Sequence, residues 1–201
     1  MIKFLKVMII ILGLLGWGGT NGCKEKGNEQ VVANDVSGRD SQQISKENAY
    51  VFEDVLDLWQ KGGTDMATSQ FIQLNWDGPL IFSAESIFRL TEVQYRSLSF
   101  SEQTSIQNDF QQISGTVRGL IKHIISLGIS YRQSQDYENA ELYLLAVLKC
   151  GDRISKPELL EIVKGLGKAA SKFALNELKQ LYTETNEQVK LEEVLKRLSN
   201  I

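Results

Sequence analysis

Histidine and cysteine, the side chains most often used for zinc binding and nucleophilic catalysis, are scarce in this chain of 201 amino acids. There is one histidine, His123, and there are two cysteines, Cys23 and Cys150, far apart in the sequence. Zinc sites and nucleophilic catalysis both need several such groups that converge. His123 stands on the flank of an apolar helical pattern, where a single histidine is typical of a core edge. The sequence therefore predicts no metal site, no cofactor and no enzymatic activity.

Basic charge is also lacking. The chain has 22 Lys and Arg side chains against 25 Asp and Glu, a net charge of −3. Nucleic-acid binding depends on clustered Lys and Arg side chains that neutralise phosphates. The sequence contains no such cluster, and we therefore expect no nucleic-acid partner.

A nucleotide-binding loop is missing as well. Residues 165–170 are Gly-Leu-Gly-Lys-Ala-Ala, which has the residue order of the dinucleotide fingerprint G-x-G-x-x-A but not its expected structural context. That fingerprint binds phosphate where a strand ends and a helix begins. The residues before it, 157–164, follow a helical pattern, and no segment of the chain predicts a strand. We therefore do not expect nucleotide binding.

The N-terminal segment has the three regions of a secretory signal. Residues 1–6 carry two lysines, residues 7–17 are almost wholly apolar, and residues 18–22 are small or polar. A permanent transmembrane helix needs about 20 apolar residues, more than this run supplies. Cleavage is therefore the favoured interpretation, and it would leave 20 basic and 25 acidic side chains, a net charge of −5.

Gly22 ends this segment and Cys23 follows it directly, and here the sequence resembles a bacterial lipoprotein precursor. The resemblance implies that residues 1–22 are removed and that Cys23 becomes a lipidated N-terminus, anchored to a membrane of the cell envelope. The alternative is an ordinary signal, which would leave a periplasmic or secreted protein with a plain thiol at Cys23. A Cys23–Cys150 disulfide would then be possible in an oxidising compartment. With Cys23 lipidated, Cys150 is most simply a small buried apolar side chain.

Residues 23–47 separate this signal from the folded part. They are polar, rich in Gly, Ser, Asn, Gln, Asp and Lys, and show no sustained period. Such a composition predicts a disordered tether, and its roughly 24 residues would span about 25 to 30 Å as a flexible chain. We expect a single domain over residues 48–201.

Two successive segments at the centre of that domain, residues 106–131 and 140–148, are predicted to be helices, because each places apolar residues three or four positions apart. The second begins after the polar break 133–136 and is expected to end at Gly151. Gly115 and Gly119 lie inside the first pattern and mark either a close helix crossing or a break in the helix. The stripes are Ile106, Phe110, Ile113, Val117, Leu120, Ile124, Leu127 and Tyr131, then Ala140, Leu144, Val147 and Leu148.

Further helical patterns flank this pair. Residues 52–59 and 67–74 predict a second hairpin around Gly62 and Gly63. A helix is expected from Pro157 to about Tyr182, with Phe173 in its apolar stripe. Capping boxes are expected where Ser99 pairs with Glu102 and where Thr185 pairs with Gln188, and Thr91 is expected to cap a short helix. The fold class is therefore all-α, built from antiparallel helical hairpins.

The later hairpin resembles the tetratricopeptide repeat, whose pattern is W-x2-L-G-x2-Y followed by A-x3-F. Leu127, Gly128, Tyr131 and Ala140 occupy matching positions, with Ile124 for the tryptophan and Leu144 for the phenylalanine. The group Val163, Leu166, Gly167 and Ala170 matches the first half of the pattern. The resemblance implies a right-handed stack of hairpins and a concave surface that binds another protein.

The segment from Asn75 to Phe88 interrupts the helices with a turn and an apolar cluster. Insertions in repeat proteins often lie on the binding face, which makes this loop and the nearby Trp59 candidates for partner binding. The alternative is that the loop is held on the helical core by its own apolar side chains. The candidate residues are Trp59, Trp76, Leu80, Ile81 and Phe82.

Together these features predict an exported, lipid-anchored protein-interaction module, an adaptor or scaffold of the bacterial cell envelope with an envelope protein as its partner. One alternative is an envelope small-molecule binder or enzyme with a site between the hairpins, around Trp59, Trp76 and His123. A second alternative is an accessory subunit of an export or outer-membrane assembly complex, which rests on fold analogy alone.

Overall fold

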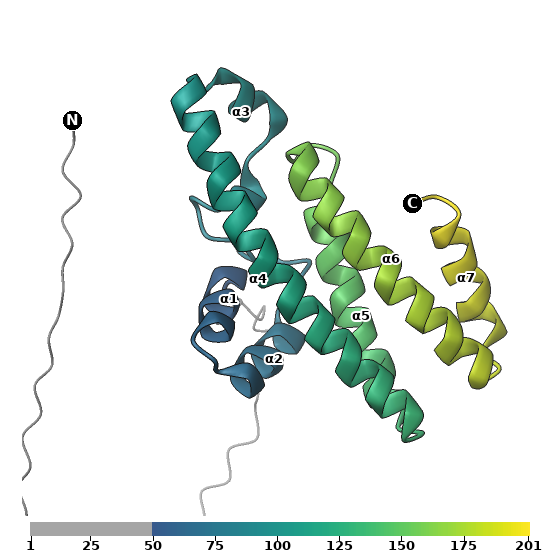
Figure 1. Ribbon diagram of the computed structural model, residues 1–201. Helices are drawn as coiled ribbons and strands as arrows, with labels where there is room; N and C mark the ends of the chain where they lie inside the picture. The colour runs from purple at the N-terminus through teal and green to yellow at the C-terminus, as the bar shows by residue number, and fades with distance from the viewer. Residues whose placement is uncertain (1–49) are drawn as a thin grey trace, which may run out of the picture. The chain divides into compact units, whose positions relative to one another are not determined.

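The computed structural model describes residues 50–201, and these residues are helical and contain no strand, which confirms the all-α prediction (Figure 1). One isolated β-bridge joins Thr91 to Leu159. The predicted signal, the predicted tether and Cys23 lie outside the described residues. The helices are α1 (Phe52–Gln60), α2 (Thr64–Gln73), the 3-10 helix η1 (Ile87–Arg89), α3 (Glu92–Ser97), α4 (Phe100–Gln133), α5 (Tyr137–Ile154), α6 (Glu161–Glu184) and α7 (Gln188–Leu198).

Helices α1 and α2 form the predicted hairpin. The turn contains Gly62 with φ of +82°, a conformation that other residues rarely adopt. Phe52 and Val55 of α1 and Phe71 of α2 are fully buried. The spacing of these residues places them on the faces of α1 and α2 that meet the core, as the sequence pattern predicts.

The loop after α2 packs onto the core, as the second interpretation of this segment predicts. Trp76, Ile81 and Phe82 are buried. The ring centroid of Phe52 lies 5.2 Å from that of Trp76 and 6.1 Å from that of Phe82. Arg153 holds the loop from α5, because its guanidinium donates to the Gly78 carbonyl at 3.3 Å and lies over the Phe82 ring.

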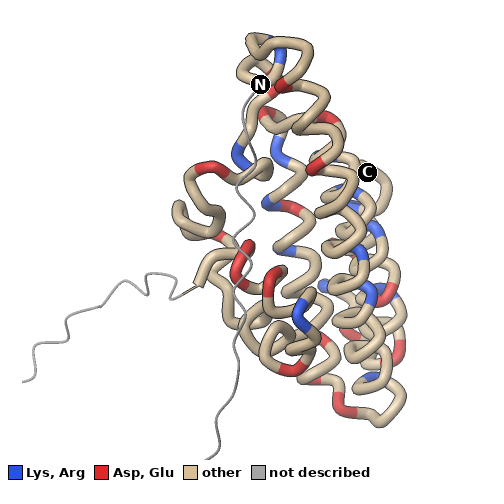
Figure 2. The backbone as a smooth tube through the Cα atoms, turned by 60° about the vertical axis from the view of Figure 1, so that its left-hand side comes forward, with Lys and Arg blue, Asp and Glu red and all other residues tan. Residues whose placement is uncertain are grey.

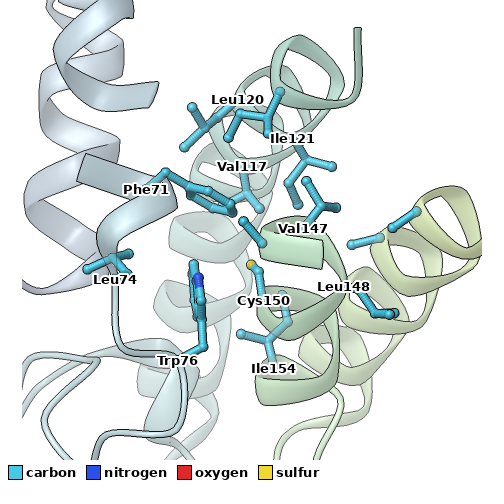
Figure 3. Packing of buried hydrophobic residues seen from close by; sticks show 14 of the residues in the cluster. Phe71, Leu74, Trp76, Val117, Leu120, Ile121, Val147, Leu148, Cys150 and Ile154 are labelled. Atoms are coloured by element: carbon cyan, nitrogen blue, oxygen red, sulfur yellow. The ribbon is translucent and has the colours of Figure 1, made fainter. Parts of the chain in front are cut away.

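Figure 3 shows the core where α2, α4 and α5 meet, with Phe71 and Trp76 facing Val147, Cys150 and Ile154. These five side chains are all buried. Because they come from segments far apart in the sequence, their burial joins the N-terminal hairpin to the later helices. This shared core supports the expectation of a single domain from residue 48 onward, whose exact bounds stay a prediction.

Helix α4 is continuous for 34 residues. It begins at the predicted capping box, in which the Glu102 amide donates to the Ser99 hydroxyl. A Cβ added at Gly119 would lie 3.3 Å from Nε1 of Trp59, whereas one at Gly115 would meet nothing within 4 Å. Gly119 therefore marks a close crossing of α1 and α4, and neither glycine breaks the helix.

Helix α5 runs to Ile154, so the prediction that Gly151 ends it is wrong. Gly151 instead lies inside α5 at its crossing with α6, where a Cβ would approach the Gly167 carbonyl oxygen to 2.8 Å and the Ser171 amide to 2.7 Å. The two helix backbones are in direct contact there. In the predicted repeat hairpin, Gly128 of α4 packs instead against the Leu144 side chain of α5. The repeat-like stacking of these hairpins stays a prediction.

Helix α6 begins at Glu161, four residues later than predicted. The preceding residues are held outside the helix because the Leu160 amide donates to the Leu90 carbonyl at 3.2 Å, next to the Thr91–Leu159 bridge. Leu159 and Leu160 are buried in this segment. The apolar residues that looked like a first helical turn therefore belong to the connection between α5 and α6. They are buried there and are hydrogen-bonded to the segment before α3.

Helix α7 begins at Gln188, but the predicted capping box at its start is wrong. The Thr185 hydroxyl donates to the Leu181 carbonyl at 3.0 Å and so serves the end of α6. Asn186 makes the turn with φ of +58°, a left-handed conformation that asparagine tolerates. Arg197 then fastens α7 to α5 with two hydrogen bonds to Asp152, at 2.6 and 2.7 Å.

Charged side chains of both signs are distributed along the helices (Figure 2). Arg132, which is largely buried, joins the end of α4 to α6 through Glu177 at 3.2 Å and Glu184 at 2.7 Å. Among residues 50–201, no helix combines the length and the apolarity that crossing a bilayer requires.

Candidate functional site

A groove of about 780 Å³ runs between α4 and α6. Its α4 wall contains Phe110, Ile121, Ile125 and Ile129, and its α6 wall contains Ile162, Leu166, Ala169 and Phe173. The volume falls in the range of roughly 300 to 1,000 Å³ that is typical of ligand sites. The groove is therefore large enough to hold part of another molecule.

The groove exists because α4 and α6 both pack against α5 and contact each other much less. Figure 1 shows α5 between them, with α4 and α6 running in the same direction on either side. Ile121, Leu166 and Ala170 are buried where α4 and α6 meet, and they form the floor. Farther from α5 the two helices leave their facing sides uncovered.

Large apolar side chains remain exposed on the α6 wall. Phe173 is 64% exposed and Ile162 is 42% exposed. The spacing of Ile162, Gly165, Ala169 and Phe173 places them in one stripe along α6. The prediction that Phe173 belongs to the buried stripe is therefore wrong, because this stripe faces the groove instead of α5.

The rim of the groove is basic on the α4 side. Arg118 and Lys122 are exposed and lie one turn apart at its edge. Neither forms an ion pair within residues 50–201, whereas Glu177, at the end of the groove on α6, is paired with Arg132. The two unpaired cations give this edge a local positive charge on an acidic protein.

The side chains that the sequence suggested for partner binding do not gather at this groove. Leu80 is 53% exposed, but Trp76, Ile81 and Phe82 are in the core. Trp59 is half-buried against His123, with 5.2 Å between ring centroids. The structure brings Trp59 and His123 together but places Trp76 elsewhere, beside Phe71 at 5.0 Å.

A second cleft, of about 620 Å³, lies between the loop after α2 and the first half of α4. Glu53, Glu85 and Asp109 surround it, and Ile106 and Ile113 supply apolar surface. One oxygen of Glu53 accepts a hydrogen bond from the Ser83 amide at 3.1 Å, while the other is buried without a partner. With Arg89 as the one cation among its lining residues, the cleft is acidic, and its lining contains no histidine or cysteine.

Among residues 50–201, Cys150 and Tyr182 are the ionisable groups whose pKa is shifted most by burial. Burial raises the pKa of the Cys150 thiol, and the nearby charge of Asp152 adds to the effect. Burial also raises the pKa of Tyr182, whose hydroxyl donates to Glu141 at 2.7 Å. Cys150 therefore stays a protonated apolar side chain. A disulfide from Cys150 would require the core around it to open, because its side chain is fully buried.

Sequence reasoning missed the groove because its walls come from helices separated by the whole of α5. The signal that was present is the stripe of Ile162, Gly165, Ala169 and Phe173, which is apolar on a second face of α6. The arrangement offers an apolar surface with a charged edge, suited to holding another chain. No family model, no curated protein and no solved structure matches this protein.

Proposed function

We propose that this protein is a protein-interaction module, anchored in the bacterial cell envelope, that holds a partner chain in the groove between α4 and α6. The observation that carries the proposal is the exposure of Phe173 and Ile162 on one wall of a groove of about 780 Å³. Contiguous exposed apolar surface of this kind is typical of interaction sites.

Burial of the exposed Phe173 side chain would contribute much of the free energy of partner binding. Burying a phenylalanine side chain that is otherwise exposed contributes about 1.5 to 3 kcal/mol. Aromatic side chains at the centre of an interface often contribute most of its binding energy. Most of the groove lining is apolar, so a partner that fills the groove would bury this ring largely against other apolar side chains.

We expect a photo-reactive phenylalanine analogue at position 173, p-benzoylphenylalanine, to form a covalent adduct with the partner in cells. Phe100 provides the matched control, because it is 85% exposed and lies at the start of α4, away from the groove. Gel shift and mass spectrometry of the full-length tagged protein would detect an adduct at either position. No adduct at position 173, or the same adduct at position 100, would contradict the proposal. Co-purification of the partner without irradiation would favour a permanent subunit over a transient adaptor.

We also propose that Cys23 carries the membrane anchor. Replacing Cys23 with serine is expected to move the protein from the membrane fraction to the soluble fraction, because each buried methylene of an acyl chain contributes about 0.8 kcal/mol. Mass spectrometry should find an N-terminal peptide that begins at acylated Cys23. Cys150→Ala, which alters the other cysteine, should leave the fractionation unchanged. An unmodified N-terminus, with Cys23→Ser fractionating as the native protein does, would remove the anchor from the proposal.

A further inference from the structure

We infer that the occupant of the α4–α6 groove is an amphipathic α-helix of another protein, with acidic side chains on the flank that faces α4. This inference rests on the proposed function and specifies its partner. It follows from four properties of the groove, which are its length, its lack of backbone hydrogen-bonding groups, its flat α6 wall and the charge of its rim.

The length fits a helix of about four to five turns. The lining runs from Phe110 to Ile129 on α4 and from Ile162 to Glu177 on α6. At 1.5 Å per residue these stretches are about 28 and 22 Å long. A partner helix of roughly 15 to 18 residues would therefore contact both walls along their length.

The walls favour a helix over an extended peptide. Every lining residue lies within α4 or α6, where the backbone N–H and C=O groups already bond along the helix. An extended segment in the groove would have to bury its own backbone groups without partners, which is unfavourable. A helix brings its backbone hydrogen bonds with it and buries only side chains.

The α6 wall allows a helix to approach closely. Gly165 and Ala169 lie between Ile162 and Phe173, and a Cβ added at Gly165 would meet nothing within 4 Å. Packed helix axes lie about 8 to 10 Å apart, and small side chains allow the shorter distances. Ile162 and Phe173 then flank the contact and would fit between the apolar side chains of the partner.

The charge of the groove's rim determines which side chains the partner helix needs on one flank. Arg118 and Lys122 lie at the α4 edge without an ion pair in the described part of the chain, while the exposed α6 residues Ile162 and Phe173 are apolar. Complementarity therefore places Asp or Glu on the side of the partner helix that faces α4, and apolar residues on the side that faces α6.

Helix α7 offers no such face to a second copy of the protein, and the apolar stripe of α6 is bordered in the groove by the cations Arg118 and Lys122, not by the acidic side chains that the rim requires. On α7, Val189 and Leu195 are exposed. They are six residues apart and therefore point about 120° away from each other around the helix. The partner helix accordingly belongs to a different protein.

Fluorescence anisotropy with three synthetic 18-residue peptides tests the inference on the full-length protein as isolated from cells. The peptides share leucines at positions i, i+4, i+7 and i+11 and differ only in one flank, which carries glutamate, glutamine or lysine. We expect the glutamate peptide to bind about three- to tenfold more tightly than the glutamine peptide, and the lysine peptide to bind least. Higher salt should reduce these differences, because the rim charges are exposed.

The double variant R118E/K122E should reverse the order of the three peptides. K172E/K179E is the matched control, because it makes the same change in net charge at exposed positions of α6 that do not line the groove. Equal binding of all three peptides, an order that R118E/K122E leaves unchanged, or no binding of any peptide would overturn the inference. The proposed function would fail separately, through the absence of a cross-link at position 173.

Discussion

Replacing Gly167 with alanine is expected to destabilise the protein by about 2 kcal/mol, within the range of roughly 1 to 3 kcal/mol for overpacking a core. The new Cβ would lie 2.6 Å from the Gly151 carbonyl oxygen and 2.7 Å from the Ser155 amide nitrogen. Both are backbone atoms, one inside α5 and one in the residue that follows it, so no side chain can move aside to make room. The two helices would have to separate along their largest contact.

Urea unfolding followed by circular dichroism would measure this loss. Gly165→Ala is the control, two residues earlier in α6, where a Cβ meets nothing within 4 Å. That change should stabilise the protein by up to about 1 kcal/mol, because glycine is a poor helix former. Equal effects of the two substitutions would show that α5 and α6 do not touch as described.

The second large effect is expected for Phe52→Ala, which should destabilise the protein by about 3 to 5 kcal/mol. Phe52 is fully buried, and its ring contacts those of Phe71, Trp76, Phe82 and Phe88 at centroid distances of 5.2 to 6.1 Å. Its removal would leave a cavity at the point where the first hairpin and the loop after α2 meet. Since a domain of this kind is stable by only about 5 to 15 kcal/mol, much of its stability would be lost.

Thermal and urea unfolding of Phe52→Ala should both report this loss. Phe100→Ala removes the same ring from a position that is 85% exposed, so its effect should stay within about 0.5 kcal/mol. A small effect at Phe52 would mean that the aromatic cluster is not part of the cooperative core.

The helices could be predicted from the sequence because their apolar spacing is set by the geometry of one helix. The ends of the helices were harder to predict. Gly151 looked like a helix terminus, but it lies at a helix crossing, and only the partner backbone of α6 distinguishes the two uses of glycine. Pro157 looked like a helix start, but hydrogen bonding of the next residues to the segment before α3 delays α6 until Glu161.

The candidate site could not be predicted, for a related reason. Periodicity assigns Phe173 to an apolar face, but it does not say whether that face meets another helix of the same chain. The apolar cluster around Trp76 is the opposite case. The sequence allowed it to be an exposed binding surface, but neighbouring aromatic rings lie beside Trp76 in the fold and leave little of the cluster exposed. Whether a face is covered depends on contacts between distant segments, which the local sequence does not encode.

The contacts of Gly167 and Gly128 support the two walls of the groove in different ways. At Gly167, α6 rests directly on the backbone of α5, and a backbone cannot yield without moving the whole helix. At Gly128, α4 rests on the side chain of Leu144, which is itself fully buried. Arg132 also holds the C-terminal end of α4 to α6. The α6 wall of the groove is therefore supported by backbone contact, whereas the α4 wall is supported by side chains.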